Sequence, residues 1–355
     1  MTKTILRLTL SGALLIFTGL AVLTANLFGS FFFSFYPAFS RWVTKILAGI
    51  TSVVPFALCE ILLVALIAWF IISLVRAIIK KRMVRWLTGV LLIGCILLTS
   101  FVTVWGLNYY APPMRERLGL SDRQFTVAEL KEATVYYRDC ANDLAYSVER
   151  GEDGVMVYYD FGTLAKAAGE GYRTLSQTVP DFGGSTVRVK KLLSSSLQGK
   201  LGTTGVFICF TGESCVSTTT HSASMPFTMC HEIGHRMAFA REDEANFAGF
   251  LACAANTRPE FRYSGYYAAF RYCYNALYEQ DPNAAKEVWS GVCGAVARDW
   301  DAAVKHYESI RSETAAEISD AVYDAYLKSF SVESGVQSYG EVTDLLLVWY
   351  FERMK

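Results

Sequence analysis

Residues Ser224-Met-Pro-Phe-Thr-Met-Cys-His-Glu-Ile-Gly-His-Arg-Met-Ala238 contain the motif His-Glu-x-x-His. Pro226 suits the first turn of a helix and Ser224 suits the position just before it, so the stretch is predicted to be helical. Residues four apart on a helix lie one above the other, which brings both imidazoles to one face. We therefore expect His231 and His235 to bind one metal ion, and zinc is the usual choice for such a pair.

Glu232 follows the first histidine and lies roughly 100° round the helix. From that position a carboxylate polarises a water on the metal without binding the metal itself. The sequence holds only four histidines, His221, His231, His235 and His306, and two of them have ligand spacing. A chain of this length carries the motif by accident about once in a hundred cases. The alternative is a core helix with a partly exposed His-Glu-His surface.

A catalytic zinc site takes three protein ligands and leaves a fourth position for water. A second helix is predicted from Arg241 to Cys253, and its first turn contains Glu242 and Glu244. Only a few residues separate this helix from His235, which implies a tight helical hairpin in which either carboxylate can face the histidines. Glu242 is therefore the candidate third ligand and Glu244 the alternative. Acids in the first turn of any helix are also favoured by its dipole.

The order His-Glu-x-x-His, followed by Glu-x-x-Ala-Asn on the next helix, resembles the gluzincin zinc metallopeptidases. That group includes membrane CAAX proteases, stress-protease relatives and antitoxin-type peptidases. Carried over to this sequence, the resemblance implies Glu242 as the zinc ligand and Asn246 as the residue that orients the site from behind it. It implies Glu232 as the general base, within a zincin-like fold that combines helices with a short sheet.

In gluzincins the strand just before the active helix forms one edge of the cleft and binds substrate in extended form. The run Gly205-Val-Phe-Ile-Cys-Phe210 is short, apolar and bounded by glycines, and is predicted to be a strand. The resemblance implies that Val206 to Phe210 pair with a peptide backbone. The alternative is a buried strand whose edge is covered.

Beyond the motif, the chain is similar to an uncharacterised bacterial family, a domain of unknown function in which three membrane spans precede an HExxH domain. The matching stretches are Val104-Trp-Gly-Leu-Asn-Tyr-Tyr110, Phe210-Thr-Gly-Glu213, Pro226-Phe-Thr-Met-Cys-His-Glu232 and Ser338-Tyr-Gly-Glu-Val342. Together they extend over most of the chain. This resemblance implies an architecture and no substrate.

Three apolar runs are long enough to cross a bilayer, at about residues 8–29, 55–79 and 86–107. The segment 31–54 is rich in aromatic residues and contains Pro37, so we expect it to lie along the membrane interface. Basic residues crowd the loop between the second and third spans: Arg76, Lys80, Lys81, Arg82 and Arg85. The positive-inside rule puts this loop in the cytoplasm, so three crossings of the cell membrane leave the C-terminal part extracytoplasmic.

The composition supports a membrane part and a globular part. Of 355 residues, 52% are hydrophobic, and Lys plus Arg equal Asp plus Glu at 33 each, so the net charge is zero. We predict a membrane domain, residues 1–110, and a zincin-like domain, residues 111–355, in a mainly α protein with one short sheet. The lipid bilayer is the expected partner, and no basic excess or motif indicates nucleic acid.

Further elements are predicted in the C-terminal part. Helices are expected over 126–150, with a capping box of Thr126 and Glu129, and over 160–178, 284–311, 312–327 and 339–355. Glu213 and His221 precede the active helix and are expected to be ordinary loop residues. A tyrosine or arginine within 262–272 is a candidate to stabilise an oxyanion, although tyrosines at helical spacing commonly pack a core.

These patterns favour a membrane-anchored zinc metallopeptidase acting on a peptide or protein substrate. His231, His235 and Glu242 would hold Zn2+, and Glu232 would act as general base on the attacking water. The alternative is a non-catalytic membrane scaffold or sensor with a structural metal site, although such a site has no use for Glu232. A transporter is disfavoured, because three spans without a set of intramembrane charges make a poor pathway.

Overall fold

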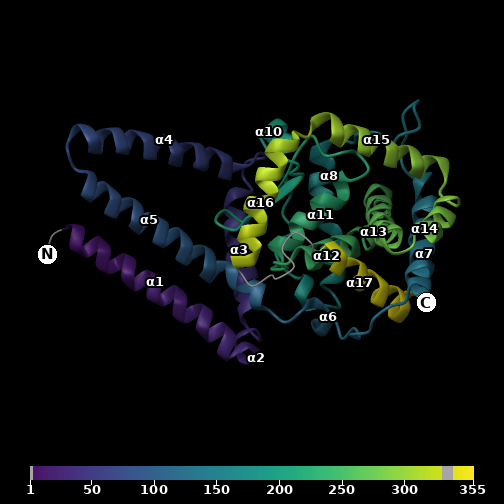
Figure 1. Ribbon diagram of the computed structural model, residues 1–355, viewed down its shortest axis with the longest axis horizontal. Coiled ribbons are helices and arrows are strands. Elements are labelled where there is room, and N and C mark those ends of the chain that lie inside the picture. Colours follow the sequence, from purple (N-terminus) through teal and green to yellow (C-terminus); the bar gives the residue numbers. More distant parts are fainter. Residues whose placement is uncertain (1–2, 330–338) are drawn as a thin grey trace.

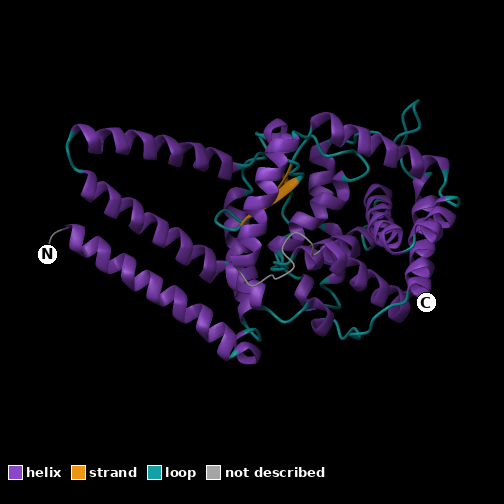
Figure 2. Cartoon of the chain, in the orientation of Figure 1, coloured by secondary structure: helices purple, strands orange, loops and turns teal. Residues whose placement is uncertain are grey.

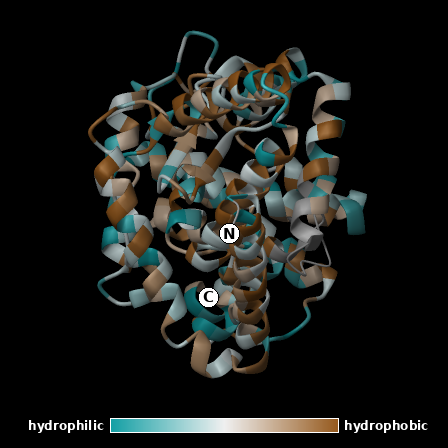
Figure 3. Cartoon of the chain, turned by 90° about the vertical axis from the view of Figure 1, so that its left-hand side faces the viewer, coloured by the Kyte–Doolittle hydropathy of each residue, from teal (hydrophilic) through white to brown (hydrophobic). Residues whose placement is uncertain are grey.

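The computed structural model describes residues 3–329 and 339–355, which form mostly helices and one small sheet (Figures 1 and 2). Three helices are long and apolar enough to cross a membrane: α1 (Lys3–Leu27), α4 (Leu58–Ile79) and α5 (Met83–Val104). They extend from one side of a helical body, and hydrophobic residues line the helices that face the viewer from that side (Figure 3). Little of their surface is buried within the protein, so the helices indicate a membrane protein.

The predicted spans correspond to these helices, but the helix ends differ. α1 begins at Lys3 and not at residue 8, because charged residues continue the helix ahead of the apolar run. α4 begins at Leu58 and not at residue 55, because Phe56 forms a bridge with Lys191 of the body. α5 ends at Val104, and a short 3-10 helix, η1 (Gly106–Tyr110), follows it. Apolar runs therefore predict well which segments are long enough to cross a bilayer, but they predict the ends of the helices less well.

The segment predicted to lie along the interface forms the short α2 (Gly29–Phe32) and the longer α3 (Tyr36–Thr51). α3 has 16 residues, fewer than a span requires. One face of α3 is buried against the body and consists of small and polar residues and one tyrosine: Tyr36, Pro37, Ser40, Thr44, Ala48 and Thr51. The opposite face exposes Phe39, Trp42, Ile46 and Ile50. α3 is therefore amphipathic in the sense that an interfacial segment requires.

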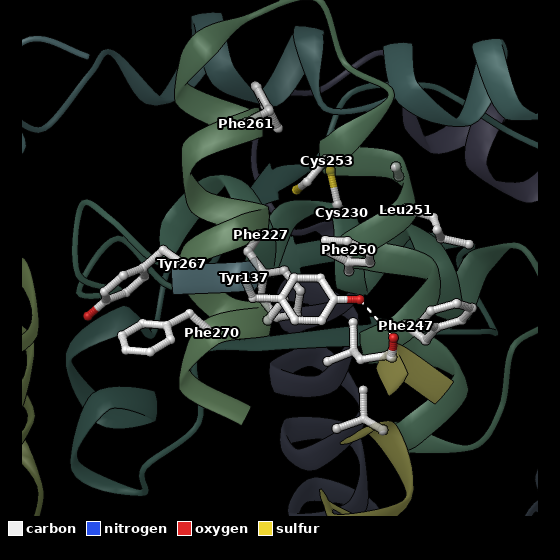
Figure 4. Packing of buried hydrophobic residues seen from close by; sticks show 14 of the residues in the cluster. Tyr137, Phe227, Cys230, Phe247, Phe250, Leu251, Cys253, Phe261, Tyr267 and Phe270 are labelled. Carbon is white, nitrogen blue, oxygen red and sulfur yellow. Dashed lines mark hydrogen bonds between the residues drawn. The ribbon is translucent and has the colours of Figure 1, made fainter. Parts of the chain in front are cut away.

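Two adjacent helices form the centre of the body, α11 (Met225–Arg236) and α12 (Glu242–Ala254). α13 (Pro259–Gln280) packs against both of them and against α7 (Val127–Ala145). Aromatic side chains fill the space between these helices (Figure 4). The remaining helices are α6 (Met114–Arg117), α8 (Phe161–Ala167), α9 (Glu170–Leu175), η2 (Pro180–Phe182), α10 (Ser195–Lys200), α14 (Pro282–Trp289), α15 (Gly294–Ile310), α16 (Glu313–Ser329), α17 (Tyr339–Trp349) and η4 (Tyr350–Met354).

The helix predictions for the body are confirmed in part. The capping box of Thr126 and Glu129 begins α7 as expected, but α7 ends at Ala145 and not at residue 150. The region 160–178 contains two short helices, α8 and α9. The single helix predicted over 284–311 is wrong, because a break that includes Gly291 separates α14 from α15. The side chain of Asp281 caps the start of α14.

A three-stranded sheet lies beside α11, with strand order β1-β3-β2. β1 (Lys190–Lys191) pairs parallel with β3 (Glu213–Val216), and β2 (Gly205–Ile208) pairs antiparallel with β3. β2 is the predicted strand, two residues shorter at its end. The expectation that Glu213 is a loop residue is wrong, because it begins β3, all four residues of which are buried. β3 escaped prediction because Glu-Ser-Cys-Val lacks the apolar alternation of a half-buried strand.

The membrane helices are joined to this sheet through carboxylates. Glu213 accepts hydrogen bonds from the backbone nitrogens of Leu58 and Cys59 at 2.9 and 2.8 Å, in the first turn of α4. Glu60, in the same turn, accepts one from the backbone nitrogen of Ser194 at 3.0 Å. An anion at a helix N-terminus is stabilised by the helix dipole, so both carboxylates hold the start of α4 against the body. Their position gives them a structural role.

Candidate metal centre

The local sequence explains why α11 and α12 approach each other closely. A Cβ added at Gly249 of α12 would lie 3.1 Å from the backbone nitrogen of His231, and one added at Gly234 would lie 3.3 Å from the carbonyl oxygen of Ala245. Glycine on each helix therefore lets the two backbones come together. This close packing brings the first turn of α12 to the histidine face of α11, where Glu242 lies.

Three side chains meet at that face. Nε2 of His231 and Nε2 of His235 are 3.1 Å apart. The two oxygens of Glu242 lie 3.3 Å from Nε2 of His231 and 3.4 Å from Nε2 of His235. Among the described residues this is the one group of three or more histidine, cysteine or carboxylate side chains whose ligand atoms converge, all within 4.8 Å of one another.

These separations suit a tetrahedral zinc ion. Ligands about 2.0–2.1 Å from zinc in tetrahedral geometry lie about 3.3 Å from one another, as these three groups do. Two imidazoles and one carboxylate also form a donor set of catalytic zinc sites, in which the fourth position stays open. The residues present therefore fit zinc, both in chemistry and in spacing.

A second contact orients His235. Its Nδ1 lies 2.8 Å from the carbonyl oxygen of Phe239, which can only accept, so Nδ1 carries the proton and Nε2 keeps its lone pair for a metal. Ala238, which is in the left-handed conformation at φ 71°, turns the chain so that this carbonyl faces back to the ring. On the far side, Nε1 of Trp105 donates to the carbonyl oxygen of His235 at 3.2 Å.

Glu232 lies beside the three groups and is almost fully buried, with 4% of its surface exposed. Oε2 of Glu232 has no hydrogen-bond partner among the described residues. Burial raises the pKa of Glu232 to about 7, and the neighbouring histidines oppose this rise. The backbone of Gly205 in β2 passes so close that a Cβ there would lie 2.4 Å from Oε1 of Glu232. The carboxylate thus faces the edge strand.

Electrostatics at the site favour a cation. Burial would raise the pKa of Glu242, but His235 and His231 outweigh it, and the pKa lies well below its ordinary value. Burial would lower the pKa of His235, but Glu242 outweighs it and raises the pKa to about 9. A buried carboxylate and two imidazoles therefore stabilise positive charge between them, either a proton or a metal ion.

The alternative third ligand, Glu244, faces away from the histidines. Its oxygens accept hydrogen bonds from the backbone nitrogen of Met114 at 2.6 Å and from the guanidinium of Arg117 at 3.0 Å. Asn246 is buried one turn after Glu242, as its expected position behind the ligand requires. Its side-chain nitrogen has no hydrogen-bond partner among the described residues, so its orienting role stays a prediction.

The other predicted residues lie apart from this group. His221 is a loop residue, as expected, and its ring centroid lies 5.8 Å from that of His306. Tyr263 and Tyr267 of α13 are buried in the core. The hydroxyl of Tyr263 donates to Asp299, which gives this tyrosine a structural partner. These contacts therefore favour the core interpretation for Tyr263 and Tyr267.

Three residues around the site were not singled out from the sequence: Gly205, Gly249 and Trp105. Glycine at the start of a predicted strand and glycine within a predicted helix are both signals of close backbone approach. Neither signal says which side chain comes close. The contact of Trp105 with His235 joins positions 130 residues apart in the chain and has no sequence pattern.

Comparison with models of protein families gives a match over most of the chain. The family model described as "Protein of unknown function (DUF3810)" matches residues 34–347, most of the chain. That range includes α3, α4, α5 and both helices of the candidate metal centre. No curated protein and no solved structure matches.

Proposed function

The chain belongs to this family, DUF3810, and from the geometry of its site we propose that it is a membrane-anchored zinc metallopeptidase of the gluzincin type. The observation that carries the proposal is the convergence of His231, His235 and Glu242 at 3.1–3.4 Å, with the buried Glu232 beside them. Three protein ligands and an adjacent carboxylate that does not bind the metal form the arrangement of a hydrolytic zinc site.

Each residue has a separate task in the proposed reaction. His231, His235 and Glu242 hold the ion, and the hydrogen bond from His235 to Phe239 fixes the tautomer of one ligand. Zinc, when bound, supplies a Lewis acid that polarises the attacking water and the carbonyl of the peptide bond. Glu232 would take a proton from that water as the water oxygen bonds to the carbonyl carbon, and would then give the proton to the nitrogen of the leaving amine as the C–N bond breaks. The products are a carboxylic acid and an amine.

We also propose on which side of the membrane the body lies. The basic loop between α4 and α5 faces the cytoplasm, so the body is extracytoplasmic in the cell membrane. Cysteine labelling of intact cells tests this. A reporter cysteine at the exposed Tyr146 of the body is expected to raise labelling by a membrane-impermeant reagent above that of the native cysteines in the wild type, and one at Lys81 in the basic loop is expected not to raise it. The reverse pattern would invert the topology and leave the chemistry untouched.

Glu232→Gln tests the chemistry, because it removes the proton acceptor and keeps the shape of the side chain. The full chain in detergent is expected to hold one zinc with either residue at position 232. Cleavage of a peptide library is expected to fall by about 100-fold or more in the variant. Zinc content comes from elemental analysis and cleavage from mass spectrometry.

The same experiment separates the two functions considered above. Retained zinc together with library cleavage that is the same in wild type and variant would favour the scaffold with a structural metal site. Absence of zinc from the wild-type protein after equilibration with the metal would remove both. Loss of cleavage with retained zinc is the result that the peptidase requires.

A further inference from the structure

The membrane-attached helices touch the last turn of α11, where the candidate metal centre lies. Trp105, directly after α5, donates to the carbonyl oxygen of His235, and its ring centroid lies 6.2 Å from that of the His235 imidazole. Thr44 of α3 lies 3.4 Å from the carbonyl oxygen of Arg236, the next residue, as a hydrogen-bond donor. The metal centre is therefore next to the part of the chain that leaves the spans.

We place the membrane surface at the outward face of α3. This helix connects the end of α1 to the start of α4, and it runs across the ends of the spans where they join the body (Figure 1). Its outward face exposes 60% of Trp42 and 65% of Ile50, as a helix lying in the interface does. A helix is about 10 Å across, so about one helix diameter separates the bilayer surface from the last turn of α11.

β2 runs from the candidate catalytic carboxylate toward α5. Its first residue, Gly205, lies against Glu232. The ring of Phe207 then lies 5.7 Å from that of Trp105, and Phe210, just beyond the strand, lies 6.4 Å from Phe101 in the last turns of α5. Phe210 is 45% exposed, so this end of the path presents an aromatic surface.

The outer edge of β2 has no strand partner in the described part of the chain, because β2 is the last strand in the order β1-β3-β2. A polypeptide added to that edge in extended form would receive main-chain hydrogen bonds along β2. One end of the added strand would lie beside Glu232 and the other beside the end of α5.

From this placement we propose that the substrate is the juxtamembrane segment of a membrane-anchored polypeptide, bound in extended form along β2. The inference rests on the proposed peptidase function and names its substrate class. An extended chain advances about 3.3 Å per residue, so the path from Phe210 to Gly205 corresponds to about five residues. The bond that is cleaved therefore lies about three to six residues outside the bilayer.

The test uses the full chain with zinc in phospholipid nanodiscs and three forms of one random peptide library. The first form is attached directly to a hydrophobic transmembrane anchor. The second carries a flexible spacer of 20 residues between the anchor and the library. The third is free in solution. Mass spectrometry maps the cleavage sites, and the initial rates are compared at equal peptide concentration.

We expect the directly anchored library to be cleaved at least tenfold faster than the free one, with cuts about three to six residues from the anchor. The spacer form decides whether anchoring merely raises the local concentration. A tether alone would preserve fast cleavage across the spacer, whereas under the proposed geometry the spacer moves the library out of the juxtamembrane position and slows its cleavage well below that of the directly anchored form. Equal rates for all three forms, or fast cleavage of the spacer form, would overturn the inference.

A variant pair tests the role of α3 separately. Trp42→Glu with Ile46→Glu places charge on the exposed face of α3 and is expected to slow cleavage of the directly anchored library at least threefold, with no change for the free library. Tyr146→Glu, at an exposed site at the end of α7, is the matched control and should change neither. An equal response of the two proteins would contradict the membrane placement. If no library is cleaved by the wild type, the proposed function itself fails.

Discussion

Glu242 and Glu244 lie two residues apart in the first turn of α12, and their carboxylates have opposite surroundings. The carboxylate of Glu242 meets two imidazoles, whereas that of Glu244 forms an ion pair with Arg117 and accepts from the backbone of Met114. Successive side chains on a helix diverge by about 100°, so side chains two apart point to nearly opposite faces. We therefore expect the two acids to have separable tasks, Glu242 in metal binding and Glu244 in folding.

Alanine substitutions separate these tasks. Glu242→Ala is expected to lose zinc and keep most of its stability. Glu244→Ala is expected to keep zinc and to lower the free energy of unfolding by about 2 kcal/mol, because it removes one of the two carboxylates that pair with the half-buried Arg117 and leaves the buried amide of Met114 without its acceptor. Elemental analysis and thermal unfolding in detergent measure both effects. Loss of zinc from a folded Glu244→Ala protein would show that the wrong acid has been assigned.

Glu213 gives stability a dependence on pH. Burial would raise the pKa of Glu213, but the ammonium of Lys190 and the amides of α4 outweigh it and hold the pKa below its ordinary value. A carboxyl group with a lowered folded-state pKa stabilises the fold above its unfolded pKa of about 4.3, and that stabilisation is lost as the pH falls through the folded value. The wild type is therefore expected to weaken below about pH 4.

Glu213→Gln checks this origin. At pH 7 the substitution leaves the buried Lys190 without a counter-charge and is expected to cost about 3 kcal/mol of unfolding free energy. Protonation of Glu213 removes the same charge from the wild type. The difference in unfolding free energy between the two proteins should therefore shrink as the pH falls below about 4. Unfolding curves at a series of pH values measure it. A constant difference would assign the acid sensitivity to other groups.

At the scale of residues, the sequence predicts the relative positions of side chains that lie on the same helix. The positions of His231, His235 and Glu232 follow from spacing within one helix. The choice between Glu242 and Glu244 did not follow, because it depends on Arg117 and Met114, which approach α12 from a distant part of the chain. Residues whose partners are far away in sequence are the ones that pattern alone leaves undecided.

At the scale of elements, the contact of β2 with α11 is the one on which the site depends. The backbone at Gly205 lies against Glu232 with no space for a side chain. A strand in this position holds the candidate general base from one side, and β3 holds it from another, because Ser214 donates to the carbonyl oxygen of Glu232 at 2.7 Å. The sheet, although small, therefore positions the carboxylate.

Gly205→Ala is expected to displace the carboxylate of Glu232 and to reduce peptide cleavage at least tenfold, with zinc content unchanged. A misplacement of about 1 Å at a catalytic group is enough for a loss of this size. Gly49→Ala in α3 is the control, because a Cβ there meets nothing within 4 Å. Full activity of Gly205→Ala would mean that Glu232 tolerates displacement or has another role.

The sequence located most of the helices but not β3 or the break between α14 and α15. A long periodic run such as α7 is predictable because burial of one face repeats along the helix. β3 is buried on both sides by α3 and α11, a circumstance that four mixed residues cannot reveal. The pairing of Phe56 with Lys191, which shortens α4, depends likewise on a distant strand.

At the scale of the whole molecule, the membrane helices and the body share their packing. The hydroxyl of Thr44 lies 3.4 Å from the carbonyl oxygen of Arg236 as a hydrogen-bond donor, and the hydroxyl of Thr51 donates to the carbonyl oxygen of Thr211 at 3.1 Å. Trp105 packs with Cys209 and Ala240 of the body. The division into residues 1–110 and 111–355 remains a prediction, and these contacts cross it.

A fragment that starts at Ala111 tests the importance of these contacts. Without α3 and η1 the buried faces of β3 and α11 become exposed, and the hydrogen bond from Trp105 to His235 is lost. The fragment is expected to unfold at a lower temperature than the full chain, or to aggregate, and to bind zinc more weakly. Calorimetry and zinc titration of both proteins measure this. Equal melting temperatures and equal zinc affinity would establish an independent domain.

Gly212 turns the chain between β2 and β3 at φ 65°, and a Cβ there would lie 2.6 Å from both the nitrogen of Ala48 and the carbonyl oxygen of Thr44. The backbone of α3 thus packs directly against this turn, with no side chains between them. If a change in lipid acyl-chain length tilts the spans, we therefore expect the sheet and α11 to move together with α3. Bilayer thickness is therefore expected to change the height of the candidate metal centre above the lipid.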